Sequence, residues 1–324
     1  MKRSAYLLPG AVALVLTACN KDEVITPDPD GDGPDKGDTT TQRPVTPTSS
    51  ASSVKVFEYT PAPGQFINEN MDGVDTPERA CAWAQERLDK NLDVSLGAFG
   101  GFIVVGFDHS IVSHDTGYDF TIGGNAFFNA STGTGGSNEP GIVYVMQDTN
   151  GNGLPDDTWY ELMGSDTRSE TTIHNYQVTY YRPTGDGEAV RWTDNQDGEG
   201  TVDYIAVSHK QPSYYPAWVI ADTYTLSGTR LESRTDHDTV NRVWNNWAFD
   251  WGYADNMGSD RLEGEGQRNG FAIRNAVNAD FQPVGLDYID FVKVQTGVNS
   301  KAKPLGEVST EVFHFTSLSV INTQ

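Results

Sequence analysis

Most of the chain consists of short apolar runs that alternate with turn-forming residues, and this pattern constrains the fold more than any other feature. Runs of roughly four to eight residues, bounded by Gly, Asn, Asp and Pro, are typical of strands. The predicted strands are Gly101–Phe107, Tyr118–Ile122, Gly141–Gln147, Tyr176–Tyr181, Ala217–Leu226, Phe271–Ile273, Tyr288–Val294 and Glu311–Phe315. No fixed-period repeat indicates a propeller or a solenoid. The sequence therefore predicts an all-β fold, an antiparallel jelly-roll-like sandwich formed by one domain over residues 54–324.

One short helix is expected near the start of this domain. Thr76 is a suitable N-cap, and Pro77 suits the first helical position. Apolar residues then recur at helical spacing at Ala80, Trp83, Ala84 and Leu88, and the helix is expected to end near Asn91.

The N-terminal residues 1–18 have the pattern of a signal peptide. Lys2 and Arg3 precede an apolar stretch that is too short to span a bilayer comfortably, and small residues then lead to Cys19. This box resembles that of bacterial lipoproteins, which implies cleavage before Cys19 and its lipidation; an ordinary signal peptide is the alternative. The acidic residues just after Cys19 resemble a surface-export signal. We therefore expect an outer-membrane lipoprotein that faces the cell exterior.

Residues 19–53 are rich in Pro, Gly, Asp, Thr and Ser, so we expect a disordered tether there. The full chain of 324 residues carries 22 Lys and Arg against 45 Asp and Glu. Removing residues 1–18 also removes the charges of Lys2 and Arg3, which takes the formal net charge from −23 to −25. This balance argues against nucleic acid as a partner and against electrostatic docking on anionic lipid, so the lipid anchor is the expected membrane contact.

The strongest chemical motif is a candidate calcium loop that begins at Asp148. Oxygen donors recur at alternate positions, and Gly153 stands where an EF-hand loop turns sharply. Trp159 occupies the position of the final EF-hand glutamate, so the loop is more similar to thrombospondin-type or dockerin-like loops. The alternative is a turn-rich hairpin without metal. The expected ligands of a structural Ca²⁺ are Asp148, Asn150, Asn152, Leu154, Asp156 and Asp157.

Aromatic residues suggest a ligand site, although the same residues also suit a core. Aromatic side chains alternate from Trp247 to Tyr253 and would share one face of a strand. Such a face forms either a stacking platform for a sugar or another planar ligand, or part of the core. A second aromatic cluster lies beside Pro212 and Pro216, in a loop-like context where exposed aromatic residues more often serve binding. The candidate ligand-binding residues are Tyr214, Tyr215, Trp218, Trp251, Tyr253, Asp255 and Asn256.

Signals for catalysis are weak. The six His residues are scattered, and no metalloprotease, nucleophile-elbow or phosphate-loop motif occurs. A pair of glycosidase carboxylates remains open because acidic residues are abundant. Cys81, which has no cysteine partner in the domain, is expected to be a small buried apolar residue.

Several stretches together resemble a family of Bacteroidota cell-surface lipoproteins, some of which carry PKD-like modules. These stretches are Val105–His109, Asn138–Val143, Asp148–Leu162, Tyr176–Pro183, Trp192–Gln196, Trp251–Asn256, Asp290–Thr296 and Gly306–Val312. The resemblance implies a companion of a TonB-dependent uptake system, with cobalamin acquisition as one setting. It assigns no binding residue.

Three functions follow as hypotheses. The first is a surface lipoprotein, not an enzyme, that captures a nutrient for an outer-membrane transporter, with a cobalamin-type corrinoid slightly favoured over a glycan. The second is an adhesin or structural surface module, and the third is a glycan-acting enzyme.

Overall fold

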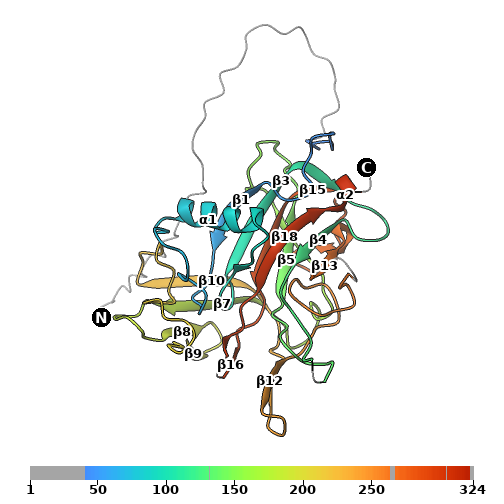
Figure 1. Ribbon diagram of the computed structural model, residues 1–324. Helices are drawn as coiled ribbons and strands as arrows, with labels where there is room; N and C mark the ends of the chain where they lie inside the picture. Colours follow the sequence, from blue (N-terminus) through green and yellow to red (C-terminus); the bar gives the residue numbers. More distant parts are fainter. Residues whose placement is uncertain (1–40, 131, 263–266, 304, 322–324) are drawn as a thin grey trace, which may run out of the picture.

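The computed structural model describes residues 41–321 except 131, 263–266 and 304, and it is mostly β, with antiparallel sheets and few helices (Figure 1). The all-β prediction is therefore confirmed at this level. The largest sheet has six strands in the order β1-β3-β15-β5-β6-β14. Its strands are β1 (Lys55–Thr60), β3 (Phe102–Val112), β15 (Tyr288–Thr296), β5 (Gly141–Met146), β6 (Trp159–Leu162) and β14 (Ala276–Val277).

Two four-stranded sheets and two short hairpins complete the described β-structure. One sheet has the order β13-β4-β18-β2, formed by Arg268–Phe271, Phe120–Gly123, Glu311–Ser317 and Val94–Ser95. The other has the order β10-β7-β8-β9, formed by Thr223–Arg230, Ile173–Tyr181, Val190–Asp194 and Glu199–Val202. The hairpins are β11 (Thr235–Asp238) with β12 (Val243–Asn246), and β16 (Lys301–Ala302) with β17 (Gly306–Glu307).

The main core lies between one face of the six-stranded sheet and the sheet that contains β18. Val143, Val292 and Val294 contribute from the first sheet, and Ile122 and Phe315 from the second. Alternate residues of each strand point to the same face, so the opposite face of the six-stranded sheet carries another set of side chains. That second face includes Tyr144 and Lys293, which are direct cross-strand partners.

Helix α1 (Pro77–Asp89) forms where the sequence predicts it. The hydroxyl of Thr76 accepts the N–H of Arg79 at 3.3 Å, as an N-cap does. The buried residues of helix α1 join the main core. They include Cys81, which is a buried residue as expected. The other helices are a 3₁₀ turn at Ile273–Asn275 and α2 (Leu318–Ile321). Among the residues that the structure describes, no helix has the length and apolarity to cross a membrane.

Three boundaries differ from expectation. The strand predicted over Phe271–Ile273 is instead β13, which ends at Phe271, and Ile273 begins the 3₁₀ turn. Strand β10 begins at Thr223 rather than Ala217, because Val219 N–H bonds back to Pro216 in a turn. Residues 41–53 do not behave as a tether either. The Ser110 N–H donates to the Arg43 carbonyl, the Arg43 N–H donates to the side-chain hydroxyl of Ser110, and the Ser53 N–H donates to the Phe315 carbonyl. The signal peptide 1–18, Cys19 and the rest of the expected tether lie outside the described residues.

Candidate functional site

Three acidic side chains from distant parts of the chain meet beside the main core. Glu139, Asp255 and Glu311 each place a carboxylate oxygen so that the three atoms all lie within 4.8 Å of one another. Asp255 and Glu311 are buried, at 0% and 3% exposed, while Glu139 keeps partial exposure. We call this group the carboxylate triad. It can hold a metal ion.

Backbone pairing brings the first two residues of the triad together. Gly141 and Ala254 exchange two backbone hydrogen bonds of 3.0 Å, and Glu139 N–H donates to the Asp255 carbonyl at 3.0 Å. Asp255 adopts a left-handed conformation with φ of 52°, which Asp tolerates better than most residues. Gly124 is needed beside it, since an added Cβ would lie 2.6 Å from the Cα of Asp255.

The third residue begins strand β18, where Glu311 pairs with Ser95 of β2. Its Oε1 accepts the hydroxyls of Ser95 at 2.9 Å and Ser309 at 2.8 Å. The Asp255 carboxylate accepts two backbone N–H groups, from Ala126 to Oδ1 at 2.7 Å and from Glu311 to Oδ2 at 3.0 Å. These contacts fix the orientation of both carboxylates before any ligand arrives.

The electrostatics of the triad are unfavourable without a cation. Burial raises the pKa of Glu139 to about 8, and the charge of Asp255 adds to the rise. Burial, together with the neighbouring acids, raises the pKa of Asp255 and of Glu311 well above the usual range. Arg261 lowers the pKa of Asp255 only through its charge, and no ion pair among the described residues involves the triad. Adjacent buried carboxylates therefore share protons or take up a cation.

The donor atoms favour a hard divalent cation. All three acids offer oxygen, and the hydroxyls of Ser95 and Ser309 lie in hydrogen-bond contact with Glu311. Oxygen-only sites suit Ca²⁺, Mg²⁺ or Mn²⁺, whereas sites for Zn²⁺ or Cu⁺ usually include His or Cys. The expectation of a metal thus gains a candidate site, at a place the sequence did not indicate.

The predicted calcium loop is an ordered turn, and its aspartates bind the loop itself. Asp148, at 3% exposed, accepts the N–H groups of Gly151 at 2.8 Å, Asn152 at 3.2 Å and Gly153 at 2.8 Å. Asp156 accepts the side-chain amides of Asn150 and Asn152 at 3.0 and 2.9 Å. Asp157 accepts the backbone N–H of Thr149 at 3.0 Å, and Leu154 N–H donates to Asn152 at 2.7 Å. Among the described residues these aspartates do not converge as the triad does; Ca²⁺ in this loop stays a prediction.

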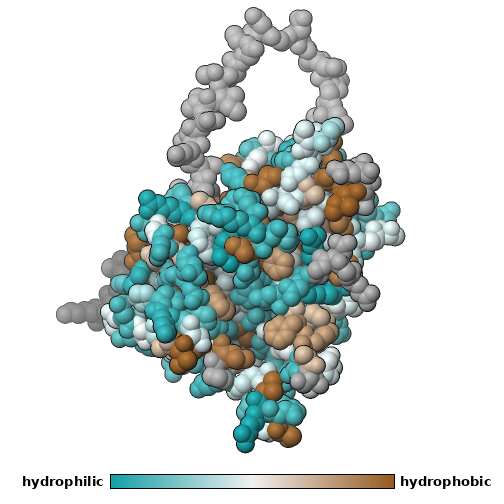
Figure 2. Space-filling model, in the orientation of Figure 1, coloured by the Kyte–Doolittle hydropathy of each residue, from teal (hydrophilic) through white to brown (hydrophobic). Residues whose placement is uncertain are grey.

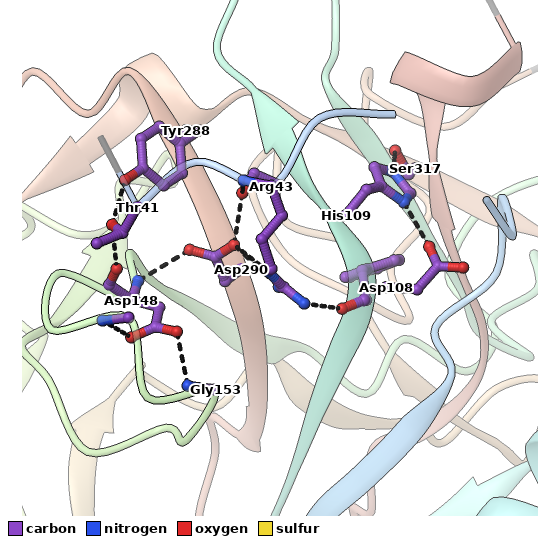
Figure 3. Close-up of polar contacts among 12 residues, drawn as sticks. Thr41, Arg43, Asp108, His109, Asp148, Gly153, Tyr288, Asp290 and Ser317 are labelled. Carbon is purple, nitrogen blue, oxygen red and sulfur yellow. Dashed lines mark hydrogen bonds and ion pairs between the residues drawn. The ribbon is translucent and has the colours of Figure 1, made fainter. Parts of the chain in front are cut away.

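The loop is also tied to the N-terminal segment (Figure 3). Asp290, which is fully buried, accepts the guanidinium of Arg43 at 2.9 Å and the backbone N–H of Asp148 at 2.9 Å. Thr41 donates its hydroxyl to the Asp148 carbonyl at 2.5 Å and lies 2.6 Å from the hydroxyl of Tyr288. The chain therefore enters the domain beside this loop.

The predicted exposed aromatic cluster is buried, so the expectation of a surface site there was wrong. Tyr214, Tyr215 and Trp218 are 0%, 1% and 7% exposed. The two tyrosines join the core of the β10-β7-β8-β9 sheet, and Trp218 joins the main core. Their polar atoms bond internally: the hydroxyl of Tyr215 donates to Ala221 at 3.0 Å.

The aromatic run near Trp251 is not a strand, so its side chains do not share one face. Phe249 and Tyr253 are buried, whereas Trp247 is 40% exposed. Asn256 closes the turn, since its amide accepts Phe249 N–H at 2.8 Å and donates to Phe249 carbonyl at 2.9 Å. Trp251 lines a small cavity. Of the seven predicted ligand residues, only Asp255 enters the triad.

Sequence reasoning missed Glu139 and Glu311 as site residues. Each lies in one of the stretches that carry the family resemblance, as does Asp255. A charged residue at the start of an apolar strand, as at Glu311, was the available signal. No protein-family model matches the chain, and no curated protein gives a significant match to it.

Proposed function

We propose that this protein is a cell-surface lipoprotein that binds a hard divalent cation, Ca²⁺ foremost, in its carboxylate triad and captures a nutrient for an outer-membrane transporter. The observation that carries the cation-binding part is the convergence of Glu139, Asp255 and Glu311. The last two are buried, and none of the three forms an ion pair with a basic side chain among the described residues. The lipid anchor expected at Cys19, and the resemblance of the acidic residues after it to an export signal, support the location.

The ion has a structural role in this proposal. It joins the segment of Glu139, the turn of Asp255 and the start of β18. Among the described residues, backbone pairing links the first two segments through Gly141 and Ala254, whereas Glu311 pairs with Ser95 instead. Neutralising three acids in one place replaces a mutual repulsion with attraction. We also propose that the two sheets around the main core form a jelly-roll-like sandwich, which the shared core residues support.

The nutrient is expected to be neutral or weakly charged, because the negative field of the protein would repel an anion. The full chain has a formal net charge of −23, and the loss of Lys2 and Arg3 with the signal peptide makes it −25. A corrinoid and a glycan both meet this condition. Four cavities of the described structure have volumes between about 220 and 350 Å³. They suit one or two sugar units better than an enclosed corrinoid, so the glycan class now has the stronger support.

Thermal unfolding in Ca²⁺ and in chelator tests the cation-binding proposal. A native-state ligand stabilises by about 2.7 kcal/mol at a hundredfold excess over its Kd. The sharpest variant is Glu311→Gln, because the amide oxygen of Gln can accept the same two serine hydroxyls while one ligand charge is lost. We expect this variant to lose most of the Ca²⁺ shift and to be no less stable than wild type in chelator. The exposed Glu199→Gln is the control and should respond as wild type does.

Equal Ca²⁺ shifts in Glu311→Gln and wild type would contradict the proposal. A loss of stability in Glu311→Gln that is as large in chelator as in Ca²⁺ would also contradict it, since it would assign the carboxylate a purely structural role.

A further inference from the structure

A cavity of about 320 Å³ lies on the second face of the six-stranded sheet, away from the triad's shell. Strands β15, β5 and β6 form its floor, and β10, β7 and the loop after β14 form its walls. Its size falls at the lower end of the range for small-molecule sites. Figure 2 shows, for the face drawn, hydrophobic patches scattered among hydrophilic side chains rather than one large apolar patch.

The floor of the cavity is a row of cross-strand neighbours. Lys293 of β15 pairs with Tyr144 of β5, and Tyr144 pairs with Glu161 of β6. Direct cross-strand partners project from the same face of a sheet. A cation, an aromatic ring and a carboxylate therefore stand side by side beneath the cavity.

The carboxylate in this row has an unused acceptor. Thr229 donates its hydroxyl to Oε2 of Glu161 at 2.6 Å, whereas Oε1 is buried and has no hydrogen-bond partner among the described residues. The Thr167 hydroxyl lies near Glu161 without meeting hydrogen-bond geometry. Burial raises the pKa of Glu161 to about 7. A buried acceptor without a partner costs free energy, and a ligand hydroxyl would remove that cost.

The Lys293 ammonium lies over aromatic rings and feels the charge of Glu58, although no ion pair among the described residues includes it. Its ammonium lies 4.1 Å from the ring centroid of Phe102 and 5.3 Å from that of Tyr144. Burial lowers the pKa of Lys293 to about 8. The charge of Lys293 would repel a cationic ligand. Glu161 and the protein's formal net charge of −23 would repel an anionic ligand. The row thus selects a neutral ligand.

Aromatic and amide groups line the rest of the cavity. The ring of His174 lies against that of Phe281, with centroids 4.0 Å apart and planes tilted by 41°, and Phe281 adopts a left-handed conformation with φ of 56°. A bulky residue in this conformation is unusual and marks strain that the loop maintains. Trp159 adds another ring, and Gln295 an amide.

We propose that this cavity binds a neutral pyranose unit, with Glu161 accepting a sugar hydroxyl and Trp159 stacking on the sugar ring. Sugars offer both hydroxyl donors and apolar C–H faces, which match a carboxylate beside aromatic rings. One pyranose unit matches the cavity in size, whereas a corrin macrocycle with its side chains exceeds it. The inference rests on the proposed nutrient capture and names its ligand class, while it is independent of the carboxylate triad.

The test is saturation-transfer NMR followed by calorimetry, with glucose, galactose, mannose and N-acetylglucosamine as probes at millimolar concentration. We expect at least one to bind, and Glu161→Gln or Trp159→Ala to weaken its binding about tenfold or more, as loss of a hydrogen bond to a charged group does. The exposed Glu170→Gln is the matched control and should bind as wild type. The uronic acid of the best-binding sugar should bind more weakly than the sugar itself.

Melting curves in Ca²⁺ and chelator, measured on the same variants, show that each is folded and that its triad responds. No binding of any probe by a folded wild type that responds to Ca²⁺ would overturn the sugar assignment and leave the cation proposal standing. Unchanged affinity in both cavity variants, or competition by cyanocobalamin for the same site, would also overturn it.

Discussion

The backbone N–H of Glu311 donates to Oδ2 of Asp255 at 3.0 Å, although both residues carry buried acidic side chains. The hydrogen bond fixes the distance between two groups that would repel each other if both were ionised. Glu139 approaches the same point from a third segment. Bound protons or a bound cation relieve the repulsion among the three acids, so protons and a cation compete for this place.

Stability in chelator should fall as pH rises from about 5 to 8. The unfolded acids have a pKa near 4, whereas burial raises the pKa of Glu139 to about 8 and that of its two neighbours as well. The folded state therefore binds more protons than the unfolded state in this range, and stability decreases with rising pH. Chemical denaturation at several pH values, with Glu311→Gln as the variant that flattens the slope, measures the effect. Stability that rises over the same range would contradict it.

Calcium should bind more tightly at higher pH, because the ion displaces protons from the triad. Direct titration at pH 6 and pH 8 measures the change, and Glu199→Gln is again the control. An affinity independent of pH would mean that the ion binds away from these acids.

Asp148→Ala should destabilise the protein by about 2–3 kcal/mol, since three loop N–H groups lose a charged acceptor. Equilibrium unfolding measures this loss in chelator. In the Glu311→Gln background, any Ca²⁺ response that remains is expected to come from the loop and to vanish with Asp148→Ala. If no response remains in that background, the loop is a turn held by its own hydrogen bonds.

Tyr215→Ala and Trp218→Ala should each cost about 3–5 kcal/mol of stability, because both side chains are buried in a core. Denaturant unfolding and near-ultraviolet circular dichroism check the change. The exposed Trp247→Ala is the matched control and should have a much smaller effect. Near-native stability in both buried variants would revive the surface-site interpretation of this cluster.

Cys19→Ser should prevent lipidation and either release the protein from membranes or leave it unprocessed. Metabolic labelling with palmitate, followed by fractionation, measures both effects. Cys81→Ser, a change at a buried cysteine that leaves Cys19 intact, is the control and should retain the label. Label that persists in Cys19→Ser would contradict the lipoprotein assignment.

Local pattern predicted the main strands and helix α1 well, because apolar periodicity and caps act over a few residues. The capping hydroxyl of Thr76 and the runs at Gly141 and Tyr288 all appear where expected. Short strands such as β2 and β14 have two residues each and leave no such pattern. Their positions depend on the sheets that they join.

The triad was harder to predict because its members are far apart in sequence. Asp255 drew attention as part of an aromatic run, but its neighbours Glu139 and Glu311 meet it only after the backbone pairing of Gly141 with Ala254. The aromatic residues misled for a related reason. Prolines flank Tyr214 and Tyr215, as is common in surface loops. Only the fold packs these two side chains into the core of the β10-β7-β8-β9 sheet.

Calorimetric titration of the metal-free protein with Ca²⁺ at pH 7.5 tests the central claim most directly. We expect saturable Ca²⁺ binding by the wild type. In the Asp148→Ala background, where the loop no longer contributes, Glu311→Gln should abolish Ca²⁺ binding or weaken it at least about a hundredfold. Glu199→Gln in that same background should bind as the Asp148→Ala protein does. Ca²⁺ binding that survives Glu311→Gln unchanged, or no binding by the metal-free wild type, would contradict the claim that the triad is a cation site.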